Sequence, residues 1–192
     1  MSCNTVEESV ERAIQGGVSV VQLREKEASS RELFELAKRV KRVTDKYYVP
    51  LIINDRLDIC LAVDAAGVHL GQTDLPCSEA RRILGAEKII GVSAATPEEA
   101  AKAQSDGADY LGVGAVFATS TKTNTRPVTA ETIRAIRSTV DIPFVVIGGV
   151  NSENISGLYG LGINGAAVIS AIISQPDITA AARKMRQAAE RL

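Results

Sequence analysis

Three polar side chains alternate along Gln22-Leu23-Arg24-Glu25-Lys26, directly after an apolar, β-branched run. Successive side chains of a strand point to opposite faces, so Gln22, Arg24 and Lys26 share one face if the extended conformation persists through residue 26. Two fixed cations and an amide donor suit the oxygens of a phosphate or pyrophosphate. The competing interpretation is a charged strand end in water, and the motif alone does not decide between them.

Two carboxylates, Asp55 and Asp74, follow consecutive predicted strands. Carboxylates on neighbouring loops can share a hard cation, and Mg²⁺ commonly takes one or two of them together with phosphate oxygens of a substrate. Asp55 could instead cap the next helix, and Asp74 could begin a turn before Pro76. Each is weak alone, and the nearby cations strengthen the metal interpretation.

A polar loop and two later strand ends add phosphate-binding chemistry. Residues 119–126 hold four threonines and two cations, and the loop around them is long enough to fold over a ligand as a lid; a disordered surface loop is the alternative. Gly148-Gly149 and Ile169-Ser170 end the last two predicted strands. Barrels often bind phosphate there through backbone N–H groups, and glycine permits a close approach.

Composition excludes several other classes of function. A net charge of −1 and 4% aromatic residues argue against a nucleic-acid binder. Cys3, Cys60 and Cys77 lack the spacing of a zinc site or a disulfide framework. His69, the one histidine, alternates with apolar residues on a predicted strand, so we interpret it as a hydrogen-bonded packing residue rather than a base.

The elements that must position these groups alternate between strand and helix. Seven short apolar runs predict strands covered on both faces, which is typical of a parallel sheet. They are residues 18–23, 50–53, 67–70, 88–92, 110–113, 144–147 and 165–169. Capping signals such as Ser29 with Glu32, and Thr96 before Pro97, mark the helices between them.

Polar residues gather after nearly every strand, which favours a (βα)₈ barrel, where all these ends meet at one face. An open doubly wound sheet would concentrate them at one switch point. The first helix, about residues 6–15, has no strand before it, so the barrel is expected to lack its first strand. Without a linker or low-complexity stretch, residues 1–192 are predicted to form a single domain.

Neither a membrane span nor a signal peptide is recognisable in the sequence, so we expect a soluble, cytoplasmic protein that does not act at a membrane. Its partners are expected to be small molecules. The oligomeric state stays open, a homo-oligomer included.

Seven motifs in chain order resemble the thiamine-phosphate synthase family over residues 10–180. They are QLREK at 22–26, IND at 53–55, HLGQTD at 69–74, GVSAAT at 91–96, FATSTK at 117–122, IGGV at 147–150 and VISAI at 168–172. The resemblance implies a (βα)₈ TIM barrel and a transferase of thiamine biosynthesis. That enzyme joins hydroxymethylpyrimidine pyrophosphate to thiazole phosphate and releases pyrophosphate.

The resemblance also implies roles for individual residues. Asp55 and Asp74 match the family's Mg²⁺ ligands. The positions that match ligands of the pyrimidine pyrophosphate are Gln22, Arg24, Lys26, Asn54, Ser93 and Lys122, and those on the thiazole phosphate side are Thr119, Ser120, Thr121, Gly149, Ile169 and Ser170. Among these, Lys122, Ser93 and Arg24 are expected to carry the catalytic role.

The implied mechanism is dissociative: pyrophosphate leaves first, and the thiazole nitrogen then attacks the pyrimidine cation. It needs charge neutralisation and positioning rather than a protein nucleophile. The sequence departs from the family at its N-terminus, where members begin with an additional strand. We interpret this as an internal methionine taken as the start, or as a truncation.

Two other functions compete with the transferase. One is a thiazole tautomerase-like isomerase of the same fold, which needs a proton-transfer residue instead of metal and pyrophosphate ligands. The other is a non-catalytic barrel that binds a phosphate ligand, because a missing strand would leave sheet edges open. The intact QLREK, Asp55, Asp74 and Lys122 set argues against the isomerase.

Overall fold

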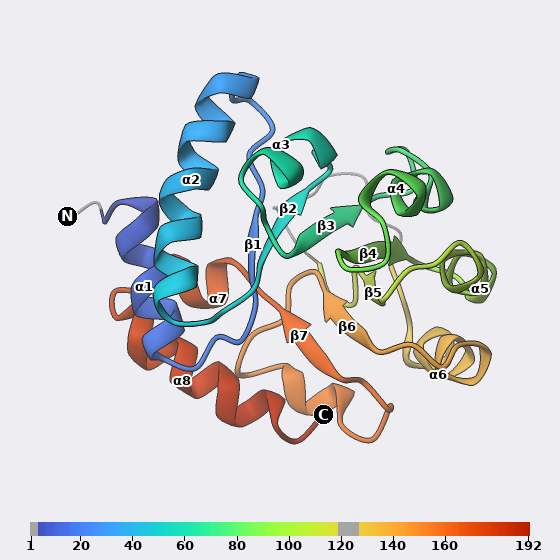
Figure 1. Ribbon diagram of the computed structural model, residues 1–192. Helices are drawn as coiled ribbons and strands as arrows, with labels where there is room; N and C mark the ends of the chain where they lie inside the picture. Colours follow the sequence, from blue (N-terminus) through green and yellow to red (C-terminus); the bar gives the residue numbers. More distant parts are fainter. Residues whose placement is uncertain (1–3, 119–126) are drawn as a thin grey trace.

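The computed structural model describes residues 4–118 and 127–192, in which one parallel sheet carries seven strands in chain order (Figure 1). The strands are β1 (Val21–Leu23), β2 (Leu51–Asn54), β3 (Gly67–Leu70), β4 (Ile89–Ala94), β5 (Tyr110–Gly114), β6 (Phe144–Ile147) and β7 (Gly165–Ala167). Each neighbouring pair is parallel. An unreversed order is that of a barrel-type sheet, so the predicted barrel architecture with seven strands is confirmed.

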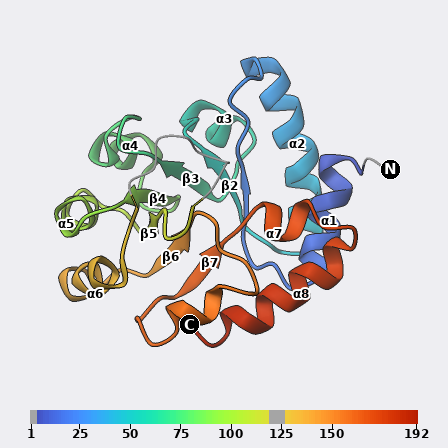
Figure 2. The same cartoon turned by 180° about the vertical axis from the view of Figure 1, so that it is seen from behind.

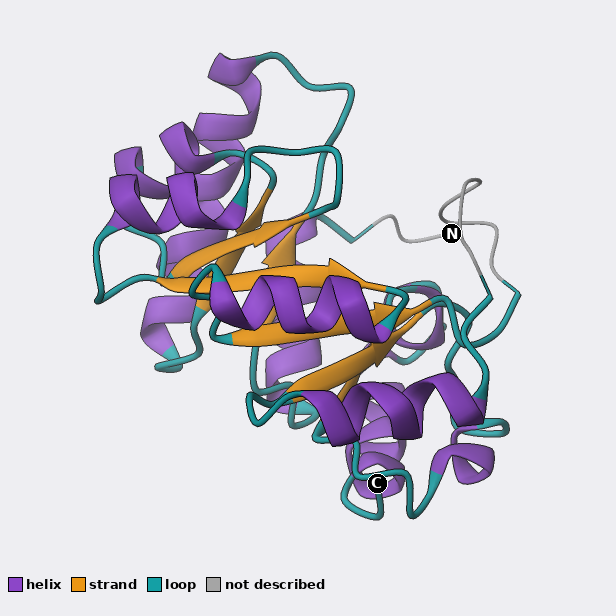
Figure 3. Cartoon of the chain, turned by 90° about the vertical axis from the view of Figure 1, so that its right-hand side faces the viewer, coloured by secondary structure: helices purple, strands orange, loops and turns teal. Residues whose placement is uncertain are grey.

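Helices cover the outer face of this curved sheet, as the side view in Figure 3 shows. They are α1 (Val6–Gln15), α2 (Ser30–Lys46), α3 (Leu57–Ala62), α4 (Cys77–Leu84), α5 (Pro97–Ser105), α6 (Ala130–Thr139), α7 (Ser170–Ile173) and α8 (Ile178–Ala189), with a short 3₁₀ helix, η1 (Ile155–Leu158). Strand and helix residues join in one apolar cluster, in which Leu111, Ile133 and Phe144 are almost fully buried.

Local signals set the helix boundaries. Thr5 and Ser29 each form a capping box with the glutamate three residues later, which satisfies backbone N–H groups at the starts of α1 and α2. The buried positions of α2 recur every three or four residues, at Leu33, Ala37 and Val40. This spacing places one apolar face toward the sheet and leaves the charged face in water.

The two edges of the sheet, β1 and β7, face each other, and α1 packs against both α2 and α8 beside them (Figure 2). Apolar side chains are exposed near these edges: Val20 is 51% exposed and Ile169 is 53% exposed. The predicted extension of the last strand to residue 169 is wrong. β7 ends at Ala167, because Ile169 is already the N-cap of α7 and Ser170 its first residue.

No helix in the described part of the chain is long and apolar enough to cross a membrane.

Candidate active site

The predicted site residues lie at or just after the carboxyl ends of the strands. Arg24 follows β1, Asn54 ends β2 with Asp55 directly after it, and Ser93 stands near the end of β4. Gly149 follows β6, while Ile169 and Ser170 follow β7. Since the strands are parallel and adjacent in chain order, these positions belong to one rim of the sheet.

Arg24 and Lys26 lie beyond the end of β1, because the strand stops at Leu23 instead of continuing to residue 26. The Nε atom of Arg24 is buried and has no hydrogen-bond partner. A buried donor on a cation costs free energy unless an acceptor forms a hydrogen bond with it. Lys26 Nζ lies 3.5 Å from Asp55 Oδ2, so one of the two cations already faces the acidic residue of the next strand end.

The structure brings Asp55 and Asp74 together. Burial raises the pKa of Asp55, and a hydrogen bond with Asp74 and the charge of that carboxyl raise it further, while Lys26 lowers it. The second oxygen, Oδ2, of Asp74 accepts a 2.6 Å hydrogen bond from the Gly71 N–H, which fixes its direction. Two carboxylates in contact repel one another when both are ionised, and a cation between them would remove that repulsion.

Asp55 also has a strained backbone, with φ of +63°. This left-handed conformation is costly for a residue with a side chain, although aspartate tolerates it better than most. The Asp55 N–H donates to the His69 carbonyl at 2.9 Å, and the next N–H, of Arg56, donates to the Asn54 carbonyl at 2.8 Å. These bonds hold the turn that directs Asp55 along the rim instead of into the following helix.

This carboxylate pair fits Mg²⁺. Within residues 4–118 and 127–192 no group of three or more His, Cys, Asp or Glu residues is placed to hold a metal by itself. Mg²⁺ does not require one, since it keeps water ligands and often binds through two carboxylates and substrate phosphate oxygens. A cavity of about 250 Å³ beside the pair is lined by Lys26, Asn54 and Asp55, among others.

A chain of hydrogen bonds runs beneath Ser93. His69 Nε2 lies 2.9 Å from Ser93 Oγ, and His69 Nδ1 lies 3.0 Å from the Tyr110 hydroxyl. Burial raises the pKa of Tyr110 to about 12, although a hydrogen bond with the Gln22 side chain lowers it. His69 is on β3 and Tyr110 is on β5, so their hydrogen bond spans the intervening strand β4.

Sequence reasoning missed Tyr110, whose ring fills the space above Gly91. A Cβ at Gly91 would come within 2.1 Å of that ring, and one at Gly112 within 2.9 Å of the His69 ring. Glycine inside a strand often marks such a close approach, so Gly91 and Gly112 were the available signal.

Gly149 lets the segment after β6 approach the segment after β5. Its φ is +66°, and a Cβ there would come within 2.5 Å of the Ala118 carbonyl oxygen. At the next strand end, Ser170 opens the short helix α7, whose first N–H groups have no acceptor within the helix. The predicted residues Thr119, Ser120, Thr121 and Lys122 lie outside the described part of the chain.

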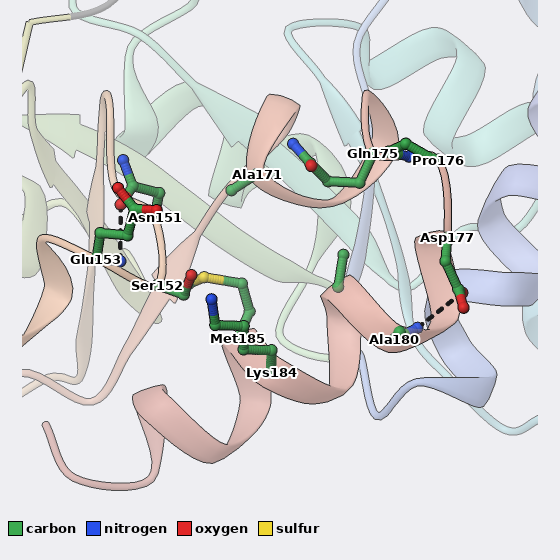
Figure 4. Close-up of a pocket in the computed structure, with 11 residues that line it drawn as sticks. Asn151, Ser152, Glu153, Ala171, Gln175, Pro176, Asp177, Ala180, Lys184 and Met185 are labelled. Atoms are coloured by element: carbon green, nitrogen blue, oxygen red, sulfur yellow. Dashed lines mark hydrogen bonds between the residues drawn. The ribbon is translucent and has the colours of Figure 1, made fainter.

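A second, larger cavity of about 590 Å³ lies away from these residues, between the segment after β6 and helix α8 (Figure 4). None of the predicted site residues lines it. Two of its polar side chains already have local partners: Asn151 accepts hydrogen bonds from the N–H groups of Glu153 and Asn154, and Asp177 caps α8. We therefore place the chemistry at the smaller cavity, which Lys26, Asn54 and Asp55 line.

Together, the fold and the site define a class: a barrel-type α/β protein whose strand ends present cations, paired carboxylates and a glycine turn suited to phosphate-bearing ligands. Residues 1–172 match the family described as thiamine monophosphate synthase. The chain belongs to this family.

Individual relatives agree with the family match. The chain is 58% identical over 185 residues to the thiamine-phosphate synthase of Ruminiclostridium cellulolyticum, which covers 96% of this chain and 88% of the relative. It is 52% identical over 192 residues to that of Clostridium botulinum, covering all of this chain and 90% of the relative. The solved structure of thiamine phosphate pyrophosphorylase from Pyrococcus furiosus superposes with a TM-score of 0.90 at 40% identity, covering 97% of this chain and 90% of that one.

These comparisons confirm the resemblance inferred from the seven motifs, and with it the transferase class and the thiamine-phosphate synthase function. The names of these relatives do not favour the isomerase or the non-catalytic binder.

Proposed function

We propose that this chain condenses hydroxymethylpyrimidine pyrophosphate with thiazole phosphate, with Mg²⁺ as cofactor and with the rim residues in the roles given below. The observation that carries the proposal is the contact between Asp55 and Asp74, at the same rim as the buried Nε of Arg24 that has no partner. Facing carboxylates and a buried donor without a partner are each costly without a ligand, and a metal-bound pyrophosphate would satisfy both.

The pyrimidine pyrophosphate would lie over the ends of β1, β2 and β4. Arg24 and Lys26 supply positive charge there, and Asn54 and Ser93 supply an amide and a hydroxyl; Gln22 and Lys122 complete the set. Arg24, Ser93 and Lys122 take the catalytic role, because they would bind the leaving group as its negative charge grows.

Asp55 and Asp74 would hold the Mg²⁺ ion. When bound, the ion would neutralise charge on the pyrophosphate. The 2.6 Å hydrogen bond from the Gly71 N–H holds Asp74 toward Asp55 in advance, so little ordering remains to be done when the ion arrives.

Thiazole phosphate would bind at the ends of β6 and β7. Gly149, Ile169 and Ser170 offer backbone N–H groups and one hydroxyl, and Thr119, Ser120 and Thr121 add hydroxyl donors from the loop after β5. This arrangement places the two substrates side by side on the rim, with the pyrophosphate toward the carboxylate pair.

The reaction then needs no protein nucleophile. The bond between the pyrimidine methylene carbon and the pyrophosphate oxygen breaks, and both electrons leave with the oxygen. The amino group of the pyrimidine stabilises the cation, and the thiazole nitrogen donates its lone pair to form the new carbon–nitrogen bond. The protein contributes charge neutralisation and positioning, each worth several kcal/mol at most sites.

The test is pyrophosphate release from the purified chain. We expect release only when both substrates and Mg²⁺ are present, and its loss with EDTA or in Asp55→Ala, Asp74→Ala and Lys122→Ala. Full activity in all three variants would refute the assigned roles. Tautomerisation in metal-free buffer would instead support the isomerase, and calorimetric binding of thiazole phosphate without turnover would support the binder. The cytoplasmic location stays a prediction.

A further inference from the structure

A partly buried chain of hydrogen bonds beneath the rim has one end at a proposed catalytic residue. It joins three side chains from three strands, in the order Tyr110, His69 and Ser93. We propose that His69 is a positioning residue, which donates from Nε2 to Ser93 Oγ and so leaves the hydroxyl proton of Ser93 for the substrate. The inference rests on the proposed function, in which Ser93 contacts the pyrimidine pyrophosphate.

The direction of the hydrogen bonds follows from Tyr110. Its hydroxyl is largely buried, so its O–H needs a hydrogen-bond acceptor. Among the described residues, the acceptor within hydrogen-bond distance is His69 Nδ1, 3.0 Å away. A neutral imidazole that accepts at Nδ1 carries its proton on Nε2, 2.9 Å from Ser93 Oγ. Every donor in the chain therefore points toward Ser93.

The consequence falls on Ser93. Its oxygen accepts the His69 proton, so its own O–H is free to donate to a developing negative charge at the rim. The backbone of the same residue is held as well, because Gln72 Nε2 donates to the Ser93 carbonyl at 2.6 Å. A hydroxyl fixed in position and polarity costs little reorganisation when the leaving group departs.

Packing holds the hydrogen-bonded side chains in place. The rings of His69 and Tyr110 lie 5.5 Å apart between centroids, in the space that Gly91 and Gly112 leave open. His69 is only 6% exposed, and each of its ring nitrogens already lies within hydrogen-bond distance of a hydroxyl. These contacts suit orientation of Ser93 and do not suit a proton-transfer base that must reach the substrate.

A matched pair of substitutions tests the role. The amide nitrogen of His69→Gln can reach the place of Nε2, whereas the shorter His69→Asn reaches only that of Nδ1. We expect kcat to fall about 10- to 100-fold in His69→Asn, with the KM for thiazole phosphate unchanged, and His69→Gln to restore most of the loss. In a Ser93→Ala background, His69→Asn should cause no further loss.

Equal losses in His69→Asn and His69→Gln at equal folded fraction, or an additive loss in the Ser93→Ala background, would overturn the proposal. Thermal unfolding of each variant gives the folded fraction.

A second measurement does not depend on activity. Because His69 is the one histidine, ¹⁵N spectra of the untagged chain contain a single imidazole. We expect the neutral tautomer with hydrogen on Nε2 at neutral pH, and Tyr110→Phe should lose it. An imidazolium ion, or hydrogen on Nδ1, would overturn the inference. Failure of pyrophosphate release in the wild type would instead count against the proposed function, so the two failures are distinguishable.

Discussion

Charged side chains are paired differently at the two ends of the strands. Below the strands, the Arg81 guanidinium donates to the carbonyls of Gly85, Lys88 and Gly107 and to Asp109, at 2.6 to 3.1 Å. At the rim, by contrast, Arg24 Nε has no partner, and Asp55 and Asp74 face each other. Arg81 is thus fully paired at one end, whereas at the rim one arginine nitrogen has no partner and two carboxyl groups face each other.

This difference separates stability from function. Every hydrogen bond that Arg81 makes is present before any ligand binds, so its free energy stabilises the folded chain. The rim keeps its interactions incomplete, and a ligand that completes them gains binding free energy. In barrels, the amino ends of the strands serve stability and the carboxyl ends carry the active site, and the charges here follow that division.

The largest effect is expected from Asp55→Asn and Asp74→Asn. Each removes a proposed ligand of Mg²⁺, so we expect kcat to fall about 10²- to 10³-fold. The midpoint of thermal unfolding without Mg²⁺ should not fall, because the substitution also removes the repulsion between the carboxyls. Steady-state kinetics and calorimetry measure the two effects. A loss of stability without a loss of activity would remove the contrast between the two ends.

Arg24→Met probes the unpaired cation. We expect kcat/KM for the pyrimidine pyrophosphate to fall about 10- to 100-fold, the range for a lost charge-assisted hydrogen bond. The free energy of unfolding should stay equal or rise, because a buried donor without a partner disappears. Denaturant titration checks this, and marked destabilisation would show that Arg24 serves the fold as Arg81 does.

Arg81→Met is the opposite case. It leaves three carbonyl groups without their donor, so we expect a loss of about 3 kcal/mol in the free energy of unfolding and a midpoint lower by about 10 °C. Activity at 20 °C below the new midpoint should be unchanged.

The matched control for Arg81→Met is Arg82→Met, one residue further along α4. Arg82 has a side chain that is 72% exposed and pairs only with Glu79 among the described residues. Arg82→Met should lower the free energy of unfolding by less than about 0.5 kcal/mol. Equal losses in the two variants would mean that the clamp of Arg81 does not stabilise the fold.

Tyr110 makes the stability of the folded chain depend on pH. The pKa of Tyr110 is raised to about 12 in the folded chain by burial, against 10 in the unfolded chain. A raised pKa means that this group's contribution to stability is complete below pH 10 and is lost as the pH rises through 12. We expect roughly 3 kcal/mol to be lost over that window, and Tyr110→Phe to lose less. Alkaline denaturation followed by tyrosinate absorbance provides the measurement. If stability fell equally steeply with pH in the wild type and in Tyr110→Phe, the prediction would be contradicted.

Two glycines with similar positive φ angles give the smallest effect. Gly85 at the lower end has φ of +73° and open space around it, while Gly149 at the rim has φ of +66° and the Ala118 carbonyl 2.5 Å from a built Cβ. Gly85→Ala should cost about 1 kcal/mol through backbone strain alone, without loss of activity. Gly149→Ala should cost more and should raise the KM for thiazole phosphate. If Gly85→Ala and Gly149→Ala had equal stability and equal kinetics, Gly149 would not belong to the site.

Much of the fold could be read from the sequence, because the signals are local. Seven apolar, β-branched runs predicted the seven strands, and the capping signals at Ser29 and Thr96 predicted two helix starts. The end of the last strand was misplaced, since Val168 and Ile169 have the composition of a strand although the chain turns there into α7. Propensity does not register a turn imposed by packing.

The residues of the site could be predicted from the sequence, but their geometry could not. The motifs named Arg24, Asp55 and Asp74, but the burial of one guanidinium nitrogen and the contact between two carboxyls depend on where neighbouring strands end. Tyr110 and the Arg81 clamp gave no motif at all. Most of their partners lie far away in the chain: His69 is 41 residues from Tyr110, and Gly107 and Asp109 are 26 and 28 residues from Arg81.

By itself, the sequence determined the alternation of strands and helices, the polar strand ends and the family, because side-chain periodicity and residue type are written along the chain. Only the tertiary structure decided which charges meet. The assembled sheet brings His69 to Tyr110, and neighbouring strand ends bring Asp55 to Asp74. Electrostatic and hydrogen-bond energies depend on distances of a few ångströms, and those distances exist only after the strands have assembled.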